Sequence, residues 1–180
     1  MIVEQSKSII AEVNKALVGK QDVVEKALMA IYAGGHILLE DVPGTGKTTL
    51  AQALSKALDL ECKRIQFTPD TMPSDITGFT MYNRKTSEFT FNWGAVNCNL
   101  LLADEINRTS AKTQSALLEV MEELSVTVDG VTRPVPRPFV CIATENPVGS
   151  AGTQPLPDSQ LDRFMVRLSI GYPTAQDQVN

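Results

Sequence analysis

Cysteine, histidine and long apolar runs are all scarce in this 180-residue chain. Its three cysteines, Cys62, Cys98 and Cys141, lie far apart. Such sparse cysteines favour a reducing compartment and form neither a disulfide framework nor a zinc site. No apolar run approaches the roughly 20 residues that a membrane-spanning helix needs. The start, MIVEQSKSIIAEVNK, contains two glutamates and no continuous apolar stretch, which does not fit a signal peptide. We therefore expect a cytoplasmic protein without membrane insertion.

Positive charge is also in short supply. The chain has 16 Lys and Arg residues against 21 Asp and Glu residues, a formal net charge of −5. A uniformly acidic chain is a poor general ligand for polyanions, so we do not expect nucleic acid as a partner unless a basic groove is concentrated on one face. The apolar fraction of 43% is sufficient for a buried core, and the length fits one domain.

Apolar residues follow two different spacings along the chain. Helical spacing occupies residues 2–17, 21–33, 47–58 and 112–124, and short strand-like runs occupy 36–40, 62–67, 99–103, 139–144 and 165–170. Strands that alternate with helices predict an α/β fold, with a parallel five-stranded sheet between helices. His36 begins the first of these strands, where we expect it to have a structural role rather than to bind a ligand.

Two segments interrupt this alternation. Residues 88–93, EFTFNW, alternate aromatic and polar side chains and indicate part of a small hairpin. Residues 126–132, VTVDGVT, place an Asp-Gly turn between two β-prone arms, which is a strong hairpin signal. We therefore expect two β-hairpin insertions in the α/β core.

A glycine-rich run lies between the first predicted strand and a helix, as a phosphate-binding loop requires. The run consists of Pro43, Gly44, Thr45, Gly46, Lys47 and Thr48, and Thr49 follows it. Its glycines allow successive backbone N–H groups to point at phosphate oxygens, and the helix adds partial positive charge. Lys47 can reach the β- and γ-phosphates, and the Thr48 hydroxyl suits Mg²⁺. One position departs from the G-x-x-x-x-G-K-T pattern, because Asp41 stands where the first glycine would be.

A second motif is the apolar run Leu100–Ala103, which ends in the carboxylates of Asp104 and Glu105. At the carboxyl edge of a parallel sheet, Asp104 would hold the Mg²⁺ hydration shell beside Thr48. Glu105 would point differently and polarise an attacking water. On its own such a pair is often a solvated turn, but the upstream loop favours the functional interpretation.

With these motifs and two later ones, the chain resembles the core of an AAA+ ATPase of the MoxR family. The segments are LLEDVPGTGKTTLA, LLLADEINRTSAKTQSALLEVMEE, ATENP and LPDSQLDRFMVRL, which occur in the family's order and cover nearly the whole chain from about residue 18. The resemblance implies the P-loop NTPase fold of an AAA+ large subdomain and Mg²⁺-dependent ATP hydrolysis. It also implies a ring, expected to be a hexamer, that remodels or activates client proteins, including ones with von Willebrand A-type domains.

The resemblance assigns three further roles. Asn146 matches the polar residue that contacts the γ-phosphate or the water, and Arg163 matches the arginine finger that reaches the neighbouring subunit's nucleotide. Val18 and Gly19 match the segment that lines the adenine pocket. Each has a simpler alternative: an Asn-Pro turn at Asn146, an exposed pairing of Arg163 with a nearby aspartate (Asp158 or Asp162), and a helix ended by Gly19.

The hairpins leave the function open between three classes. They resemble inserts that face the central pore in related motors, although ordinary surface hairpins that cap the core would look the same. A helicase of the minichromosome-maintenance type also uses such inserts, and a nucleotide-gated scaffold with little turnover is a third class. The hairpin tips carry mixed charge, Arg84 and Lys85 on one and Asp129 on the other, which argues weakly against DNA.

AAA+ modules continue into a small helical lid with a second arginine sensor. This sequence reaches YPTA at residues 172–175, where the lid should begin. Either the sequence is a truncated core or the protein is naturally short. We expect truncation, with residues 1–180 forming one AAA+ core domain whose lid is cut off after about residue 173. Without a lid, one wall of the nucleotide pocket is missing, so we expect weak binding and low turnover from this piece.

Overall fold

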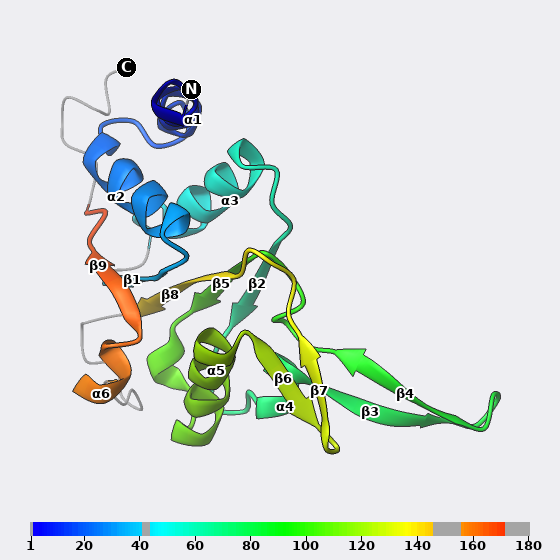
Figure 1. Cartoon of the computed structure of the whole chain (residues 1–180). Helices are drawn as coiled ribbons and strands as arrows, with labels where there is room; N and C mark the ends of the chain where they lie inside the picture. Colours follow the sequence, from blue (N-terminus) through cyan, green and yellow to red (C-terminus); the bar gives the residue numbers. More distant parts are fainter. Residues whose placement is uncertain (1, 41–43, 146–155, 172–180) are drawn as a thin grey trace.

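A parallel five-stranded sheet forms the centre of the computed structural model, which describes residues 2–40, 44–145 and 156–171 (Figure 1). Its strands are β2 (Cys62–Gln66), β5 (Leu100–Asp104), β8 (Val140–Glu145), β1 (His36–Glu40) and β9 (Phe164–Leu168), in that spatial order. Each neighbouring pair is parallel. The α/β class and all five strands predicted from the sequence are confirmed.

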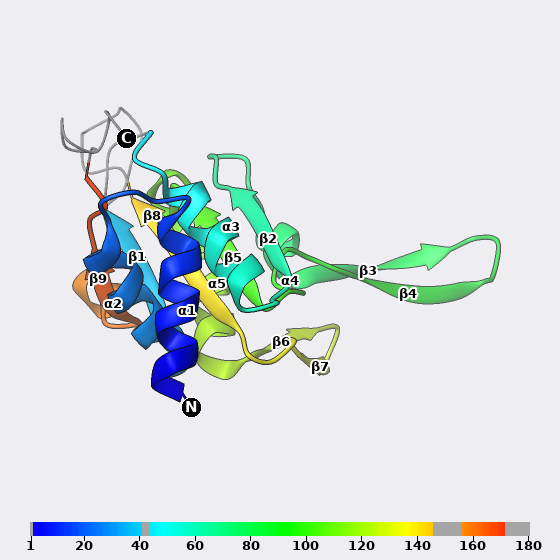
Figure 2. The same cartoon turned by 90° about the horizontal axis from the view of Figure 1, so that it is seen from above.

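Helices cover both faces of the sheet (Figures 1 and 2). One face carries α1 (Ile2–Asn14), α2 (Gln21–Tyr32) and α3 (Lys47–Ala57), and the other carries α5 (Ala111–Glu123). Three short elements complete the fold: α4 (Pro73–Thr77), a 3₁₀ turn (Ile106–Arg108) and α6 (Asp158–Leu161). None of the helices in the described ranges is long and apolar enough to cross a membrane.

The central strands are buried on both sides, which explains their continuous apolar sequence. Along β5, Leu100 and Leu102 join the core beneath α1–α3, whereas Leu101 and Ala103 join the core beneath α5. This alternation follows from the two-residue period of a strand. A parallel sheet covered on both faces therefore needs apolar residues at every position rather than at every second one.

Two antiparallel hairpins extend from the α5 side. They are formed by β3 (Gly78–Asn83) with β4 (Glu88–Trp93), and by β6 (Ser125–Val128) with β7 (Val131–Pro134). Asp129 and Gly130 have φ values of 53° and 73°, the left-handed conformation that a tight hairpin turn requires. The sequence-based prediction of both hairpins is confirmed.

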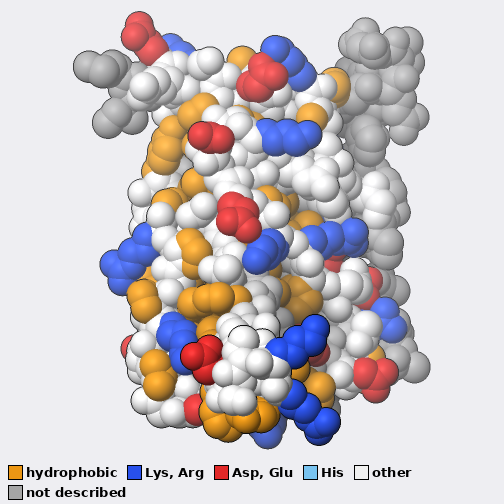
Figure 3. Space-filling model, turned by 90° about the vertical axis from the view of Figure 1, so that its right-hand side faces the viewer, with side chains coloured by type: hydrophobic (Ala, Val, Ile, Leu, Met, Phe, Trp, Pro, Cys, Tyr) orange, Lys and Arg blue, Asp and Glu red, His pale blue; other side chains and the backbone are white. Residues whose placement is uncertain are grey.

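The hairpins lie side by side and differ in how they use their aromatic residues. The Arg133 guanidinium of β7 lies 4.0 Å from the ring centroid of Phe91 on β4, and Phe91 packs against the core. Phe89 is 76% exposed. Figure 3 shows hydrophobic and basic side chains gathered in the lower part of the face toward which β3 and β4 project. Neither interpretation of the hairpins accounts for both aromatics, because one supports the core and the other faces solvent.

The cysteines occupy two kinds of environment. Cys98 and Cys141 are buried, but Cys62 on the edge strand β2 is only half-buried. Burial raises the pKa of the Cys98 thiol to about 12 and raises the pKa of Cys141 further. Both thiols are therefore protonated near neutral pH and behave as small apolar groups.

His36 joins two elements of the core through both of its ring nitrogens. The Cys141 N–H donates to Nδ1 at 3.0 Å, so the proton is on Nε2, which donates to the Met121 carbonyl at 3.0 Å. Burial lowers the pKa of His36, with a smaller opposing effect from the Met121 hydrogen bond. This neutral, fully bonded imidazole confirms the structural role predicted for it.

The lowered pKa of His36 predicts a pH-dependent stability. Above the unfolded-state pKa of 6.5 the imidazole is neutral in both states. As the pH falls below 6.5, the unfolded chain binds a proton first, so the free energy of unfolding decreases until the folded-state pKa is passed. Urea unfolding of the wild type and of His36→Gln at several pH values checks this. Below pH 6.5 the free energy of unfolding of the wild type should decrease relative to that of His36→Gln. Effects of the carboxylates, which both proteins share, cancel in this comparison. A difference independent of pH would contradict the assignment.

Candidate functional site

The loop before α3 and the first turn of α3 form one wall of the site. Gly44 and Gly46 have φ values of 88° and 93°, and a Cβ added to either would meet no atom within 4 Å. The glycines are therefore required by backbone conformation and not by lack of space. The helical hydrogen-bond pattern begins where Leu50 N–H donates to the Gly46 carbonyl at 2.9 Å. Pro43 and Asp41 lie outside the described residues.

A cavity of about 380 Å³ opens at this helix end and collects residues from four parts of the chain. It is lined by Gly44, Gly46, Lys47, Thr48 and Thr49 of the loop and α3, Arg64 and Gln66 of β2, Asp104 and Glu105 after β5, and Thr144 of β8. Thr45, between the two glycines, is buried. The carboxyl ends of β2, β5 and β8 thus face the loop, which is where open α/β sheets bind ligands.

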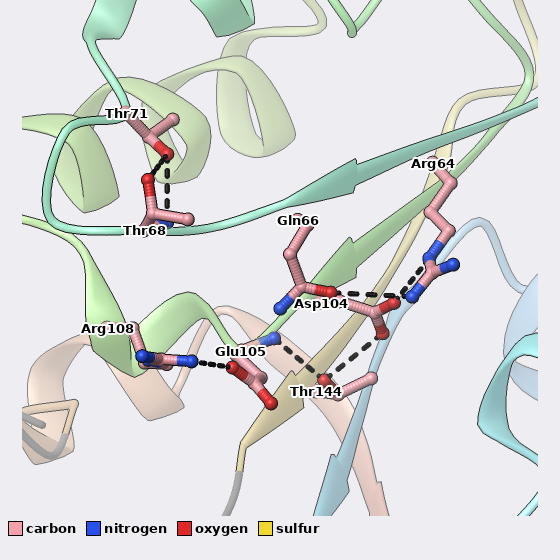
Figure 4. A network of polar contacts seen from close by, with 8 residues as sticks. All are labelled: Arg64, Gln66, Thr68, Thr71, Asp104, Glu105, Arg108 and Thr144. Atoms are coloured by element: carbon pink, nitrogen blue, oxygen red, sulfur yellow. Dashed lines mark hydrogen bonds and ion pairs between the residues drawn. The ribbon is translucent and has the colours of Figure 1, made fainter. Parts of the chain in front are cut away.

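Asp104 ends β5 and is nearly buried, with an exposed fraction of 6%. Its Oδ2 accepts from Arg64 Nε at 2.6 Å, and its Oδ1 accepts from the Thr144 hydroxyl at 3.4 Å (Figure 4). Thr48 lines the same cavity. A hydroxyl and a carboxylate oxygen are ligands that Mg²⁺ accepts, commonly with several waters retained. The donor set at this cavity therefore fits a hydrated Mg²⁺ ion, provided that Arg64 yields its position on Asp104.

Glu105 turns away from Asp104 because its backbone adopts the left-handed conformation, with φ 56° and ψ 50°. Its N–H donates to the Thr144 hydroxyl at 2.9 Å, and its Oε2 accepts from Arg108 Nη1 at 2.8 Å (Figure 4). A non-glycine residue in this conformation costs on the order of 1–3 kcal/mol, a cost that recurs at functional sites. The fully buried Thr144 hydroxyl thus connects both acidic residues and keeps them pointing in different directions.

Three polar residues of the cavity were missed by sequence reasoning, namely Arg64, Gln66 and Thr144. Arg64 and Gln66 are two apart on β2, so they share a face, and Gln66 pairs in register with Asp104. Thr144 is the penultimate residue of β8. The available signal was a polar side chain at the end of each strand. The sequence did not indicate that β2 and β8 both flank β5, so this signal could not be assigned to the site.

Arg163 lies away from this cavity. It follows α6, its side chain is 40% exposed, and among the described residues its ion-pair partner is Glu122 of α5. The alternative pairing with Asp158 or Asp162 is therefore wrong. Together with Gln160 and Glu119, Arg163 borders a separate surface hollow between α5 and α6. Among the described residues, Arg163 is not one of those that line the cavity beside Lys47.

The other residues assigned by resemblance are not among those that line the cavity in the described ranges. Val18 is 50% exposed, and Gly19 has a left-handed φ of 74° in the turn between α1 and α2. The simpler interpretation of a helix ended by Gly19 is wrong, because α1 already ends at Asn14 and Gly19 lies in the turn that follows. Asn146 lies outside the described residues, directly after the last residue of β8.

Comparisons with known proteins agree with this architecture. The sequence profile of the ATPase family associated with various cellular activities (AAA) matches residues 36–166. The chain is 54% identical to "Uncharacterized protein YeaC" of Bacillus subtilis over 171 residues, which cover 95% of this chain and 53% of that protein. It is 45% identical to "Chaperone MoxR1" of Mycobacterium tuberculosis over 169 residues, which cover 94% of this chain and 45% of that protein.

A solved structure from Cytophaga hutchinsonii, described as a candidate ATPase, superposes with a TM-score of 0.88 at 45% identity, covering 98% of this chain and 53% of that one. The chain thus spans about half the length of the curated relatives that it matches. Because the family profile covers the loop, the acidic strand end and the strand that carries Thr144, the chain belongs to the AAA family of ATPases, within its MoxR type.

Proposed function

We propose that the chain binds ATP with Mg²⁺ in the cavity before α3 and hydrolyses the terminal phosphate. The observation that supports this most directly is that Lys47, the N-terminus of α3 and the pair Asp104–Glu105 border one cavity. Family membership supports nucleotide binding and ATPase chemistry in general. Because the chain spans about half of its relatives, we propose that it carries the core domain of a longer ATPase.

Binding of the phosphates would rest on the loop and on α3. Backbone N–H groups at the start of a helix have no intrahelical acceptor, so they can donate to phosphate oxygens, aided by the partial positive charge of the helix end. Pro43, Gly44, Thr45, Gly46, Lys47, Thr48 and Thr49 form this region in our proposal. Lys47 adds a full positive charge beside the phosphates, and the Thr48 hydroxyl faces the same cavity as Asp104.

The two acidic residues would divide the remaining chemistry. Asp104 and Thr48 would hold Mg²⁺, largely through water, and the ion when bound would offset charge on the phosphate oxygens. Glu105 would accept a proton from the attacking water. Its side chain is 24% exposed and is bonded to Arg108, which keeps the carboxylate beside the cavity. Asn146 would contact the γ-phosphate or the water.

The site would be completed by a neighbouring copy. Arg163 is half-exposed and borders a surface hollow instead of the proposed nucleotide cavity of the same chain. In our proposal a neighbouring subunit therefore receives its guanidinium. A guanidinium at the γ-phosphate would stabilise charge that develops during transfer. We therefore propose a ring, expected to be a hexamer, in which each Arg163 serves the next subunit, and Val18 and Gly19 lie near the adenine.

The work done by hydrolysis is proposed from relatives. One of them is named a chaperone, which supports a chaperone-like remodelling or activation of client proteins. We propose the cytoplasm as the place of this activity. Clients with von Willebrand A-type domains are our first candidates. The exposed Phe89 and the mixed charge of the two hairpins fit a polypeptide partner better than a uniformly anionic one.

The first prediction tests whether the Lys47 ammonium group binds the phosphates. Lys47→Ala should weaken ATP binding at least about 10- to 100-fold, because a hydrogen bond to a charged group contributes about 1.5–3 kcal/mol. Titration of a fluorescent ATP analogue measures the change. Lys56→Ala, in the last turn of the same helix, removes an equal charge at a distance and should leave binding unchanged. If the Lys47 variant bound ATP as tightly as the wild type, the loop would not be the phosphate-binding element.

The second prediction tests the proposed base. Glu105→Gln keeps the size of the side chain and removes its capacity to accept a proton, so hydrolysis should slow by about a hundredfold or more while binding persists. Phosphate release under saturating ATP provides the measurement. Glu123→Gln, at the exposed end of α5, is the matched control. Normal turnover by the Glu105 variant would exclude this carboxylate as the base.

The third prediction tests the shared site. Arg163→Ala subunits lack the finger, and Lys47→Ala subunits lack nucleotide, so each protein alone should be nearly inactive. A mixed ring contains some junctions at which an intact Arg163 meets an intact Lys47, and these junctions should restore part of the ATPase rate. The rate is followed as the mixing ratio is varied. An absence of recovery in mixtures that do assemble would refute action between subunits.

A further inference from the structure

We propose that Arg64 is a built-in cation that competes with Mg²⁺ for the Oδ2 atom of Asp104. In the absence of metal, the guanidinium occupies this oxygen, and the arrival of the ion displaces it. Arg64 is thereby a positioning residue that makes nucleotide affinity depend on metal. This inference rests on the proposed binding of ATP and Mg²⁺, and it adds a residue to that site.

The geometry sets up the competition. Arg64 Nε lies 2.6 Å from Asp104 Oδ2, a short charge-assisted hydrogen bond, while Nη2 donates to Gln66 Oε1 at 3.4 Å. The carboxylate side chain is 9% exposed, whereas that of Arg64 is 54% exposed. The carboxylate is therefore largely shielded from water, whereas the Arg64 guanidinium reaches it from the edge strand β2 (Figure 4).

The burial of Asp104 explains why a cation is needed there. An ionised carboxylate removed from water is costly unless it is paired and hydrogen-bonded. The Thr144 hydroxyl supplies only a long contact of 3.4 Å to Oδ1. Arg64 supplies the charge, so the acid is stabilised and held in place before any metal binds.

The other oxygen of Asp104 is less available to a metal. Thr144, which donates to Oδ1, also accepts the Glu105 N–H at 2.9 Å, so a change at Oδ1 disturbs the position of both acidic residues. A change at Oδ2 moves only the half-exposed Arg64 side chain. A hydrated divalent cation would therefore take Oδ2, and its charge would repel the guanidinium.

This exchange has a consequence for nucleotide binding. Without metal, the Asp104 carboxylate repels the phosphates that share its cavity, and Arg64 offsets this charge. With metal, Mg²⁺ takes over that role and Arg64 becomes an obstacle. Removing Arg64 should therefore weaken metal-free binding and preserve or strengthen metal-bound binding.

The test compares the dissociation constant of a non-hydrolysable fluorescent ATP analogue in EDTA with that in saturating Mg²⁺. In Arg64→Gln the dissociation constant in EDTA divided by that in Mg²⁺ should rise by about tenfold, the scale of one charge-assisted hydrogen bond. Arg64→Met, which keeps an apolar stem of similar length, should show the same rise, and it decides the matter if the Gln variant does not fold. A ratio that is unchanged or lower than in the wild type would overturn the proposal.

Two controls separate this inference from the proposed function. Lys63→Gln removes the same charge from the preceding residue of β2, where Lys63 Nζ lies 3.8 Å from a Glu61 carboxylate oxygen, and it should leave the ratio unchanged. In an Asp104→Asn background, Arg64→Gln should no longer raise the ratio, and a persisting rise would also overturn the competition. If the wild type binds the analogue in neither condition, the proposed function itself fails.

Discussion

The buried carboxylate at the end of β5 is the constraint on which the site depends. Asp104 lies where the sheet, the glycine-rich loop and α3 meet, with little access to water. A negative charge in that position needs partners, and they come from two neighbouring strands: Arg64 on one side and Thr144 on the other. The same Thr144 hydroxyl holds the amide of Glu105, so satisfying one buried acid also orients the second.

The fold separates this cavity from the surfaces by which the protein would act on others. Strand ends and the loop form a fixed pocket because each is anchored in a core that is apolar on both faces of the sheet. Arg163 and the exposed Phe89 lie outside it, directly after α6 and on a projecting hairpin.

Several parts of the fold were predictable because they depend on local sequence. Buried parallel strands have continuous apolar runs, α3 follows two glycines with positive φ, and the Asp129-Gly130 turn determines its hairpin. The short elements α4 and α6 were not predicted, because one helical turn leaves too brief a pattern. The strand β3 was not delimited from the sequence either, although its partner β4 was recognised as half of a hairpin.

The sequence by itself determined which residues can perform phosphate chemistry: a glycine-rich loop with Lys47, and two carboxylates at the end of an apolar strand. Only the tertiary structure decided which side chains face them. Arg64 meets Asp104 because β2 is hydrogen-bonded beside β5, and Arg163 meets Glu122 because α6 packs near α5. Arg64 and Asp104 are 40 positions apart, and strand order, which no local pattern encodes, brings them within hydrogen-bonding distance.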